Sequence, residues 1–213
     1  MTLELFTLIC MSGVLLTGVA IVSRMRLISL VSVFRAQSAL LGLLALGIGW
    51  HENVPEVMAI GVLILVAKAL VIPGVLLRIR RSVHATERLH SYLRPVPTTF
   101  LALLSIGAAT SIASTVAPDA DYFFAVVAFS LILFGLILLL TRTDMYGQSV
   151  GFLVMENGIY AFGLTLAHGL PFFVEIGILF DVLIVFMLIF SLIRRAHVEH
   201  ASTTTDNLRE LTD

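Results

Sequence analysis

Residues 151–181 read GFLVMENGIYAFGLTLAHGLPFFVEIGILFD, and this stretch decides how the rest of the chain must fold. It is long and apolar enough to form most of two membrane-spanning helices joined by a short turn. Three carboxylates lie within it, those of Glu156, Glu175 and Asp181. A carboxylate at membrane depth is costly unless it faces protein or water, so all three are candidates for a functional role.

The composition of the whole chain agrees with a membrane protein. Of the 213 residues, 59% are hydrophobic and 13% are charged, and the mean hydropathy of +1.04 is far above that of a soluble domain. The single cysteine, Cys10, cannot form an intrachain disulfide, a thiolate zinc site or an iron–sulfur cluster. We therefore expect an all-α, polytopic membrane helix bundle without a cofactor or metal of its own.

Seven segments are long enough to cross a bilayer, for which about 20 mostly apolar residues suffice. They cover residues 3–23, 27–49, 56–78, 98–117, 121–141, 146–168 and 171–193. Because the N-terminus lacks the basic region of a signal peptide, we expect the first of these segments to be retained. Residues 1–195 would form the membrane domain, followed by a polar cytoplasmic tail at 196–213.

The distribution of basic residues predicts the orientation of the seven spans. The chain has 13 Lys and Arg, and all but Arg35 and Lys68 fall in or beside loops on one side of a seven-span topology. The opposite side carries only acidic residues among its charges. Since basic loops remain in the cytoplasm, the N-terminus should lie outside and the C-terminus inside.

Arg35 and Lys68 are the two basic residues within spans, in the second and the third. Each lies eight to ten residues from the cytoplasmic end of its span, which is about 12–15 Å at helical rise. Glu156 lies at a similar distance into the sixth span, and Asp181 near the middle of the seventh. The sequence therefore predicts Arg35, Lys68, Glu156 and Asp181 at comparable depth, with Glu175 closer to the outer face.

A weak internal similarity suggests a tandem repeat of three helices. The second and third spans contain RAQSALLG, IGVL and RIRR, whereas the sixth and seventh contain ENGIYAFG, IGIL and LIRR. Aligning these segments places Arg35 opposite Glu156, and Lys68 about one turn beyond Asp181. The halves would cover about residues 1–95 and 121–195, running in the same direction across the membrane.

These buried groups have the chemistry that proton transfer requires. Glu156, Asp181 and Lys68 can each gain or lose a proton, whereas Arg35 would act as a fixed charge that tunes them. Tyr160, one turn beyond Glu156, could relay or hydrogen-bond a proton. The competing interpretation is that acids and bases form static interhelical ion pairs. Pro73, five residues after Lys68, should remove a helical hydrogen bond and open the helix there.

Five segments of the chain together resemble the hydrogenase-4 component E family. They are FRAQS, VAKALVIP, GFLVMENG, VEIGILFD and the DNLREL tail, spread in order between about residues 24 and 211. Proteins of this family are membrane subunits of formate hydrogenlyase-type and other energy-converting hydrogenase complexes. The resemblance implies a bacterial or archaeal cytoplasmic (inner) membrane protein of similar role.

That family is in part similar to the K subunit of respiratory complex I, which carries a glutamate in each of two adjacent helices. Carried over, Glu156 matches the first glutamate. For the second, Glu175 matches by its E-I-G context and Asp181 by its depth, so both remain candidates. Arg35 and Lys68 stand near the positions where the K subunit has its acids. This departure leaves open whether the first half of the chain, about residues 1–95, conducts protons.

The resemblance implies a non-catalytic subunit of an oxidoreductase complex that contributes to proton translocation. No catalytic residues, cofactor or nucleic-acid partner are expected. The implied partners are antiporter-like and quinone-site-like membrane subunits, and cytoplasmic hydrogenase-like redox subunits. Two alternatives remain open from the residues alone: a structural scaffold whose buried charges are merely paired, and an autonomous small ion transporter.

Overall fold

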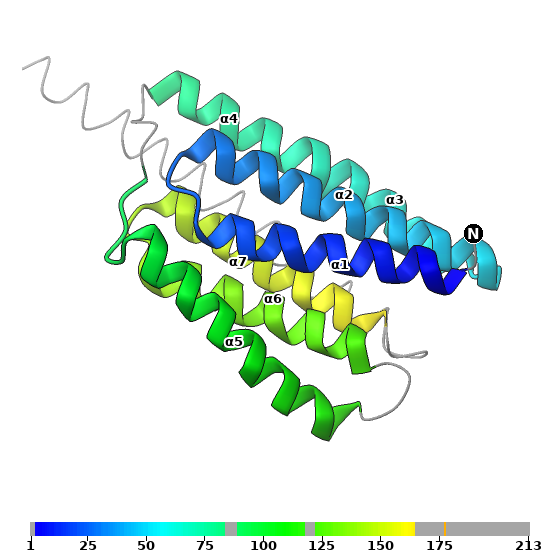
Figure 1. Ribbon diagram of the computed structural model, residues 1–213. Coiled ribbons are helices and arrows are strands. Elements are labelled where there is room, and N and C mark those ends of the chain that lie inside the picture. Colours follow the sequence, from blue (N-terminus) through cyan, green and yellow to red (C-terminus); the bar gives the residue numbers. More distant parts are fainter. Residues whose placement is uncertain (1–2, 84–88, 118–121, 165–176, 178–213) are drawn as a thin grey trace, which may run out of the picture.

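The computed structural model describes residues 3–83, 89–117, 122–164 and 177, and every named element within them is helical (Figure 1). This is the outcome expected for long apolar runs in a bilayer, where a helix satisfies each backbone N–H and C=O within its own segment. The elements are α1 (Leu3–Val22), α2 (Leu27–Glu52), α3 (Pro55–Leu63), η1 (Ile64–Val71), α4 (Ile72–Val83), α5 (Pro95–Val116), α6 (Tyr122–Thr141) and α7 (Met145–Gly163).

Within the described residues, five helical segments are long and apolar enough to cross a membrane. They are Leu3–Val22, Leu27–Glu52, Pro55–Arg78, Pro95–Val116 and Tyr122–Thr141, and they correspond to the first five predicted spans. Residues 146–163 of the sixth predicted span lie in α7, which is helical but more polar; residues 165–168 lie outside the described residues. The seventh predicted span, apart from Gly177, and the tail at 196–213 lie outside the described residues. The count of seven spans and the tandem repeat therefore stay predictions.

The third predicted span is one helical run with a change of winding in the middle. Its first part, α3, and its last part, α4, are α-helical, but the central part, η1, is a π-helix. The π-helix ends at Val71, two residues before Pro73. Since Pro73 has no N–H and its ring crowds the carbonyl four residues earlier, wider winding at this point relieves both problems. Near Lys68 the structure thus shows a change of winding, and the helical run continues without a break.

Local signals in the sequence mark the end of α2 and the beginnings of α3 and α7. The helix α2 ends at Asn53, whose φ of 56° is left-handed, a conformation that asparagine tolerates. Pro55 then occupies the first turn of α3, where no N–H is needed. At the other end of the molecule, the carboxylate of Asp144 caps α7 by accepting a hydrogen bond of 2.7 Å from the N–H of Gly147.

Glycines allow two helix pairs to pack with their backbones close together. A Cβ added at Gly135 on α6 would lie 2.6 Å from the carbonyl oxygen of Gly151 on α7, and one at Gly158 would lie 2.7 Å from that of Ala128. The same holds for α2 and α3, where a Cβ at Gly61 would lie 2.9 Å from the carbonyl oxygen of Gly42. These contacts are typical of membrane helix interfaces built from small residues.

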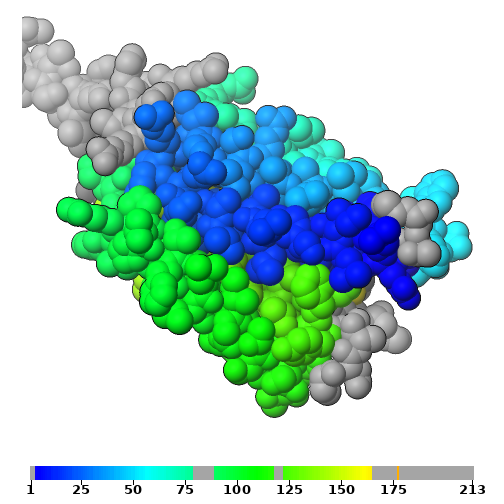
Figure 2. Space-filling model, viewed as in Figure 1, coloured from blue at the N-terminus to red at the C-terminus, as the bar shows by residue number. Residues whose placement is uncertain are grey.

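The helices lie side by side, with α5 and α6 on one side of α1 and with α2, α3 and α4 on the other (Figure 1). Packed between them is an apolar core to which α1, α2, α6 and α7 all contribute, including Met11, Phe34, Phe134 and Leu153. Helices α1 and α2 are exposed on the face of the molecule turned to the viewer in Figure 2. Most of α7 and one side of η1 face the interior, where the polar residues of interest are found.

Three of the arginine-bearing loops meet at one end of the helices. The N–H of Leu89 donates to the carbonyl of Met25 at 2.7 Å, and the N–H of Tyr92 donates to that of Thr141 at 2.9 Å. These bonds join the loop at 23–26, the segment at 89–94 and the loop after α6. The sequence prediction that these segments share one side of the membrane agrees with this arrangement.

Arg142, which the sequence predicts to be an ordinary basic loop residue, is buried at this end. Its guanidinium donates to the carbonyl of Arg24 at 2.6 Å and to that of Val22 at 3.1 Å. Burial lowers the pKa of Arg142, while the negative charge of Asp144 raises it. Arg142 therefore ties the turn between α1 and α2 to the turn between α6 and α7.

Candidate functional site

The central polar feature of the described residues is an ion pair between Lys68 and Glu156. Their charged groups are 2.9 Å apart, and each side chain is only 1% exposed. Lys68 lies on η1 and Glu156 on α7, so the pair joins two helical segments that are far apart in sequence. The structure therefore brings together two of the residues that the sequence predicts at comparable depth.

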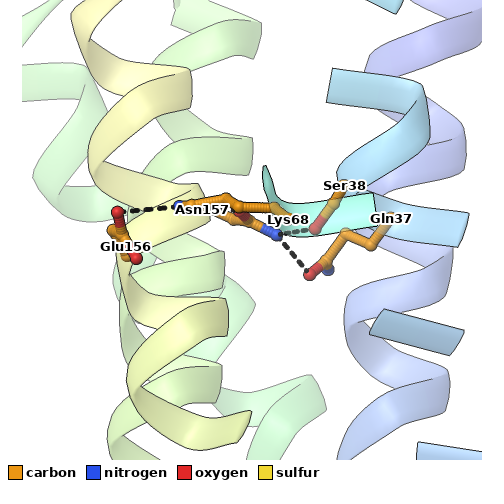
Figure 3. A network of polar contacts seen from close by, with 5 residues as sticks. All are labelled: Gln37, Ser38, Lys68, Glu156 and Asn157. Atoms are coloured by element: carbon orange, nitrogen blue, oxygen red, sulfur yellow. Dashed lines mark hydrogen bonds and ion pairs between the residues drawn. The ribbon is translucent and has the colours of Figure 1, made fainter. Parts of the chain in front are cut away.

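Asn157 extends this pair into a chain of hydrogen bonds that reaches α2 (Figure 3). Its side-chain oxygen accepts a hydrogen bond of 3.4 Å from the Lys68 ammonium. Its amide nitrogen donates to the side-chain oxygen of Gln37 at 3.2 Å and to the hydroxyl of Ser38 at 3.1 Å. Gln37 in turn donates to the backbone carbonyl of Val14 on α1 at 3.4 Å. We call Gln37, Ser38, Lys68, Glu156 and Asn157 the polar network.

Tyr160 and Gly177 also lie beside the ion pair. The Lys68 ammonium lies 4.3 Å from the centre of the Tyr160 ring, on its face, where the π electrons attract a cation. Gly177 is buried against the same group, since a Cβ added there would lie 2.6 Å from a carboxylate oxygen of Glu156. The sequence predicts Tyr160 as a proton relay or hydrogen-bond partner, and the structure places its ring over Lys68.

The π-helix decides how Lys68 reaches this position. A π-turn contains about one residue more than an α-turn, so it shifts the direction in which the following side chains point. Lys68 lies in the middle of η1 and is buried, whereas Leu70 and Val71 are exposed. Such π-helical insertions occur frequently at functional sites, and this one presents a lysine to the interior of the molecule.

Arg35, Asp181 and Glu175, the other predicted site residues, are not among the five residues of the polar network. Arg35 lies on α2, two residues before Gln37, but its side chain is exposed. A separation of two residues corresponds to about 200° around a helix, which explains why the two side chains point differently. Asp181 and Glu175 lie outside the described residues, so the choice of a second acid remains a prediction.

Gln37, Ser38 and Asn157 are part of the site although sequence analysis assigns them no role. Each is a polar side chain in the middle of an apolar span, and all three are buried. That combination is a usable signal, because a polar group at membrane depth needs a partner. The sequence alone does not show that these three would meet each other, because they come from α2 and α7.

Chemically, the polar network offers linked groups in a low-dielectric interior. A lysine and a glutamate in contact can share a proton as an ion pair or as two neutral groups, and a hydrogen-bonded amide and hydroxyl border them. Within the described residues, no group of three or more His, Cys, Asp or Glu is positioned to bind a metal ion. Because Lys68 and Glu156 can each gain or lose a proton, the ion pair is chemically able to hold or pass on protons.

Comparison with known proteins places the chain beside one curated relative. It is 31% identical over 208 residues to the uncharacterized protein Rv0085 of Mycobacterium tuberculosis (strain ATCC 25618 / H37Rv), covering 94% of this chain and 93% of that protein. No known family model matches the chain, and no solved structure matches it. Because the similarity extends over nearly the full length of both proteins, the chain belongs to the same family as Rv0085.

Proposed function

We propose that this chain is an integral membrane subunit of an energy-converting hydrogenase or formate hydrogenlyase-like redox complex, and that its polar network forms part of a proton pathway. The observation that carries the proposal is the buried Lys68–Glu156 ion pair at 2.9 Å. Buried charges within a membrane are expensive and usually mark ion or proton routes. The proposed type of complex is inferred from the resemblance to the hydrogenase-4 component E family.

In this role the chain performs no redox chemistry itself. Antiporter-like and quinone-site-like membrane subunits would lie beside it, and cytoplasmic hydrogenase-like subunits would carry the redox centres. The arginine-bearing loops at 23–26, 89–94 and 142–144 would face the cytoplasm, following the positive-inside rule. Protons would pass through the polar network as the charge on neighbouring subunits changes during turnover.

The ion pair is suited to respond to such changes. A proton delivered to Glu156 removes the negative charge that faces Lys68, and the ammonium then has only the Asn157 oxygen and the Tyr160 ring as described neighbours. Lys68 is thereby favoured to release a proton or to move toward another acceptor. One pair of side chains can thus pass on protons when its surroundings alternate between two electrostatic states.

A structural scaffold is the second candidate, and the same ion pair favours it. Lys68 and Glu156 are in direct contact and could simply join η1 to α7. The two candidate functions predict different effects of Glu156→Gln, which removes the charge of Glu156, on complex assembly and on proton translocation. If the pair conducts protons, Glu156→Gln leaves the complex assembled and lowers proton translocation. If the pair is only structural, Glu156→Gln lowers the amount of assembled complex, and the complex that remains has normal coupling.

The experiment is therefore to introduce Glu156→Gln into the full-length chain in its native membrane. Subunits that co-purify with it are quantified by mass spectrometry, and proton translocation is measured in sealed vesicles. The purified wild-type chain alone, reconstituted in liposomes, serves as a control: ion flux there would indicate an autonomous transporter. We expect full assembly, lowered translocation and no flux from the isolated chain. Normal translocation in the assembled variant would refute the proposal.

A further inference from the structure

Arg35 is an exposed cation within a membrane-spanning helix. It lies eight residues after Leu27, the first residue of α2, which is about 12 Å along a helix. Its side chain is exposed on the outside of the molecule. Among the described residues, the guanidinium has neither an ion-pair nor a hydrogen-bond partner. Because an isolated cation at this depth is unfavourable, a negatively charged partner from elsewhere would stabilise it.

The surface around Arg35 has the shape of a helix-packing face. Ser32 and Ala36 are exposed next to it, and Ala39, one turn further along the same side, is half-buried. Ile28 and Leu43, at 45% and 48% exposed, lie at either end of this stretch. We call the face formed by Ser32, Arg35, Ala36 and Ala39 the α2 outer face. Figure 2 shows α2 at the surface of the molecule. The small side chains of Ser32, Ala36 and Ala39 leave room for another helix to approach closely.

The exposed side of α5 offers a contrast within the same molecule. In the first half of this helix it carries large aliphatic side chains, Leu101, Leu103 and Leu104, each at least 40% exposed, whereas small residues such as Gly107 and Ser111 are exposed further along. Large aliphatic residues are what a helix presents to lipid chains, whereas small residues are enriched where membrane helices meet. The α2 outer face therefore differs from a lipid-facing surface in both size and charge.

A second copy of the chain does not supply the missing charge from its described residues. The exposed acids Glu4, Glu52 and Glu56 lie at the end of the helices where α2 turns into α3, and Asp144 lies in the loop that precedes α7. None of these is near the depth of Arg35. No described acid of this chain, or of a second copy of it, is therefore placed to pair with Arg35, which favours a carboxylate from a different protein that also spans the membrane.

We propose that the α2 outer face docks a transmembrane helix of a partner subunit, and that an Asp or Glu within that helix pairs with Arg35. The guanidinium would bind the carboxylate through two parallel hydrogen bonds, and Ser32, Ala36 and Ala39 would let the two backbones approach. This docking proposal rests on one part of the proposed function, namely that the chain works within a membrane complex. The docking does not depend on proton movement through Lys68 and Glu156.

The first experiment identifies what covers this face. A photo-activatable benzophenone amino acid replaces Ser32 in the full-length chain in its native membrane, and adducts are sequenced by mass spectrometry. We expect an adduct with a transmembrane segment of another subunit that contains an Asp or Glu. The matched control carries the same probe together with Arg35→Glu, and it should lose the adduct. An adduct with lipid alone, or with a second copy of this chain, would overturn the proposal.

The second experiment tests the ion pair by exchanging its charges. Arg35→Glu should lower co-purification of the cross-linked partner at least about tenfold, because two carboxylates would then face each other. Arg35→Lys should retain most of the partner, since it preserves the charge. Replacing the partner's acid by arginine in the Arg35→Glu background should restore co-purification. If the exchange fails to restore it, while each single variant is correctly inserted, the pairing is refuted.

The two proposals can fail separately. If the adduct and the rescue are both obtained but Glu156→Gln translocates protons normally, the docking surface is established and the proton pathway is wrong. If Glu156→Gln lowers translocation but the probe at Ser32 reacts only with lipid, the reverse holds. In that second case Arg35 extends its side chain to lipid head groups, as long basic side chains near a membrane surface can.

Discussion

Breaking the Lys68–Glu156 ion pair from one side should destabilise the isolated chain in detergent, whereas in the native membrane we expect contacts with partner subunits to keep the variant folded and assembled. In Glu156→Gln the Lys68 ammonium remains 1% exposed but loses the carboxylate that lies 2.9 Å away. Removing one partner of a buried pair typically costs about 3–5 kcal/mol, because the other charge is left uncompensated. The Asn157 oxygen and the Tyr160 ring remain beside Lys68, so we expect a loss near the lower end, about 3 kcal/mol.

The corresponding change at the other partner gives the second arm of the test. Lys68→Met retains much of the length and apolar character of the side chain but leaves the Glu156 carboxylate without its ammonium. We expect a similar loss of about 3 kcal/mol. The double variant removes both charges, so it should be no less stable than either single variant, which corresponds to a coupling energy of about 3 kcal/mol.

The assay is reversible unfolding of the purified full-length chain in mixed detergent micelles, followed by circular dichroism as the fraction of denaturing detergent rises. All four proteins are compared under the same conditions. Losses that simply add in the double variant, with a coupling energy near zero, would refute the reasoning. They would mean that the two side chains do not interact in the folded protein.

Further variants test the packing around the site and at the loops. Gly177→Ala should displace Glu156, because a Cβ there would lie 2.6 Å from its carboxylate. The variant should therefore lower proton translocation in vesicles. Gly74→Ala, with open space around the added methyl group, should leave translocation unchanged. Gly135→Ala should force α6 and α7 apart and cost about 1–3 kcal/mol by the same unfolding assay, again against Gly74→Ala; wild-type stability would contradict the close approach. Arg142→Lys should lose hydrogen bonds to two carbonyls and cost about 2 kcal/mol, while Arg94→Lys on the surface should change stability little; equal effects would show that Arg142 has no special role.

The long apolar runs make most of the fold predictable from sequence. Five predicted spans coincide with helices that are long and apolar enough to cross a membrane, because hydrocarbon leaves the backbone few other ways to satisfy its polar groups. Pro73 also correctly indicates a disturbance in the third span. The sequence does not specify that the disturbance is a π-helix, since proline is compatible with several kinds of local unwinding.

The candidate site is predictable only in part. Lys68 and Glu156 stand out because charges are rare in apolar spans, and comparable depth suggests that they meet. Arg35 fits the same criteria yet faces outward, because a helix that is apolar on every side gives no periodic signal of which face is buried. The contacts of Asn157 with α2 depend on how α7 packs against it, which no local sequence pattern encodes.

Arg142 shows the same limit for a charged residue in a loop. A basic residue next to a span is ordinarily exposed to water or to head groups, and the sequence prediction follows that rule. In the structure its guanidinium instead donates to the carbonyls of Val22 and Arg24. The carbonyls at the end of α1 lack helical partners, and a nearby arginine is well suited to bind them. That pairing depends on tertiary contact between two distant turns.

The most direct test of the account is the number of protons translocated per electron pair, measured in sealed native vesicles for wild type, Glu156→Gln and Glu156→Asp. If Glu156 carries protons through the polar network, the ratio falls in Glu156→Gln and is at least partly retained in Glu156→Asp, whose carboxyl group can still take up a proton. An unchanged ratio in fully assembled Glu156→Gln complex would contradict the account.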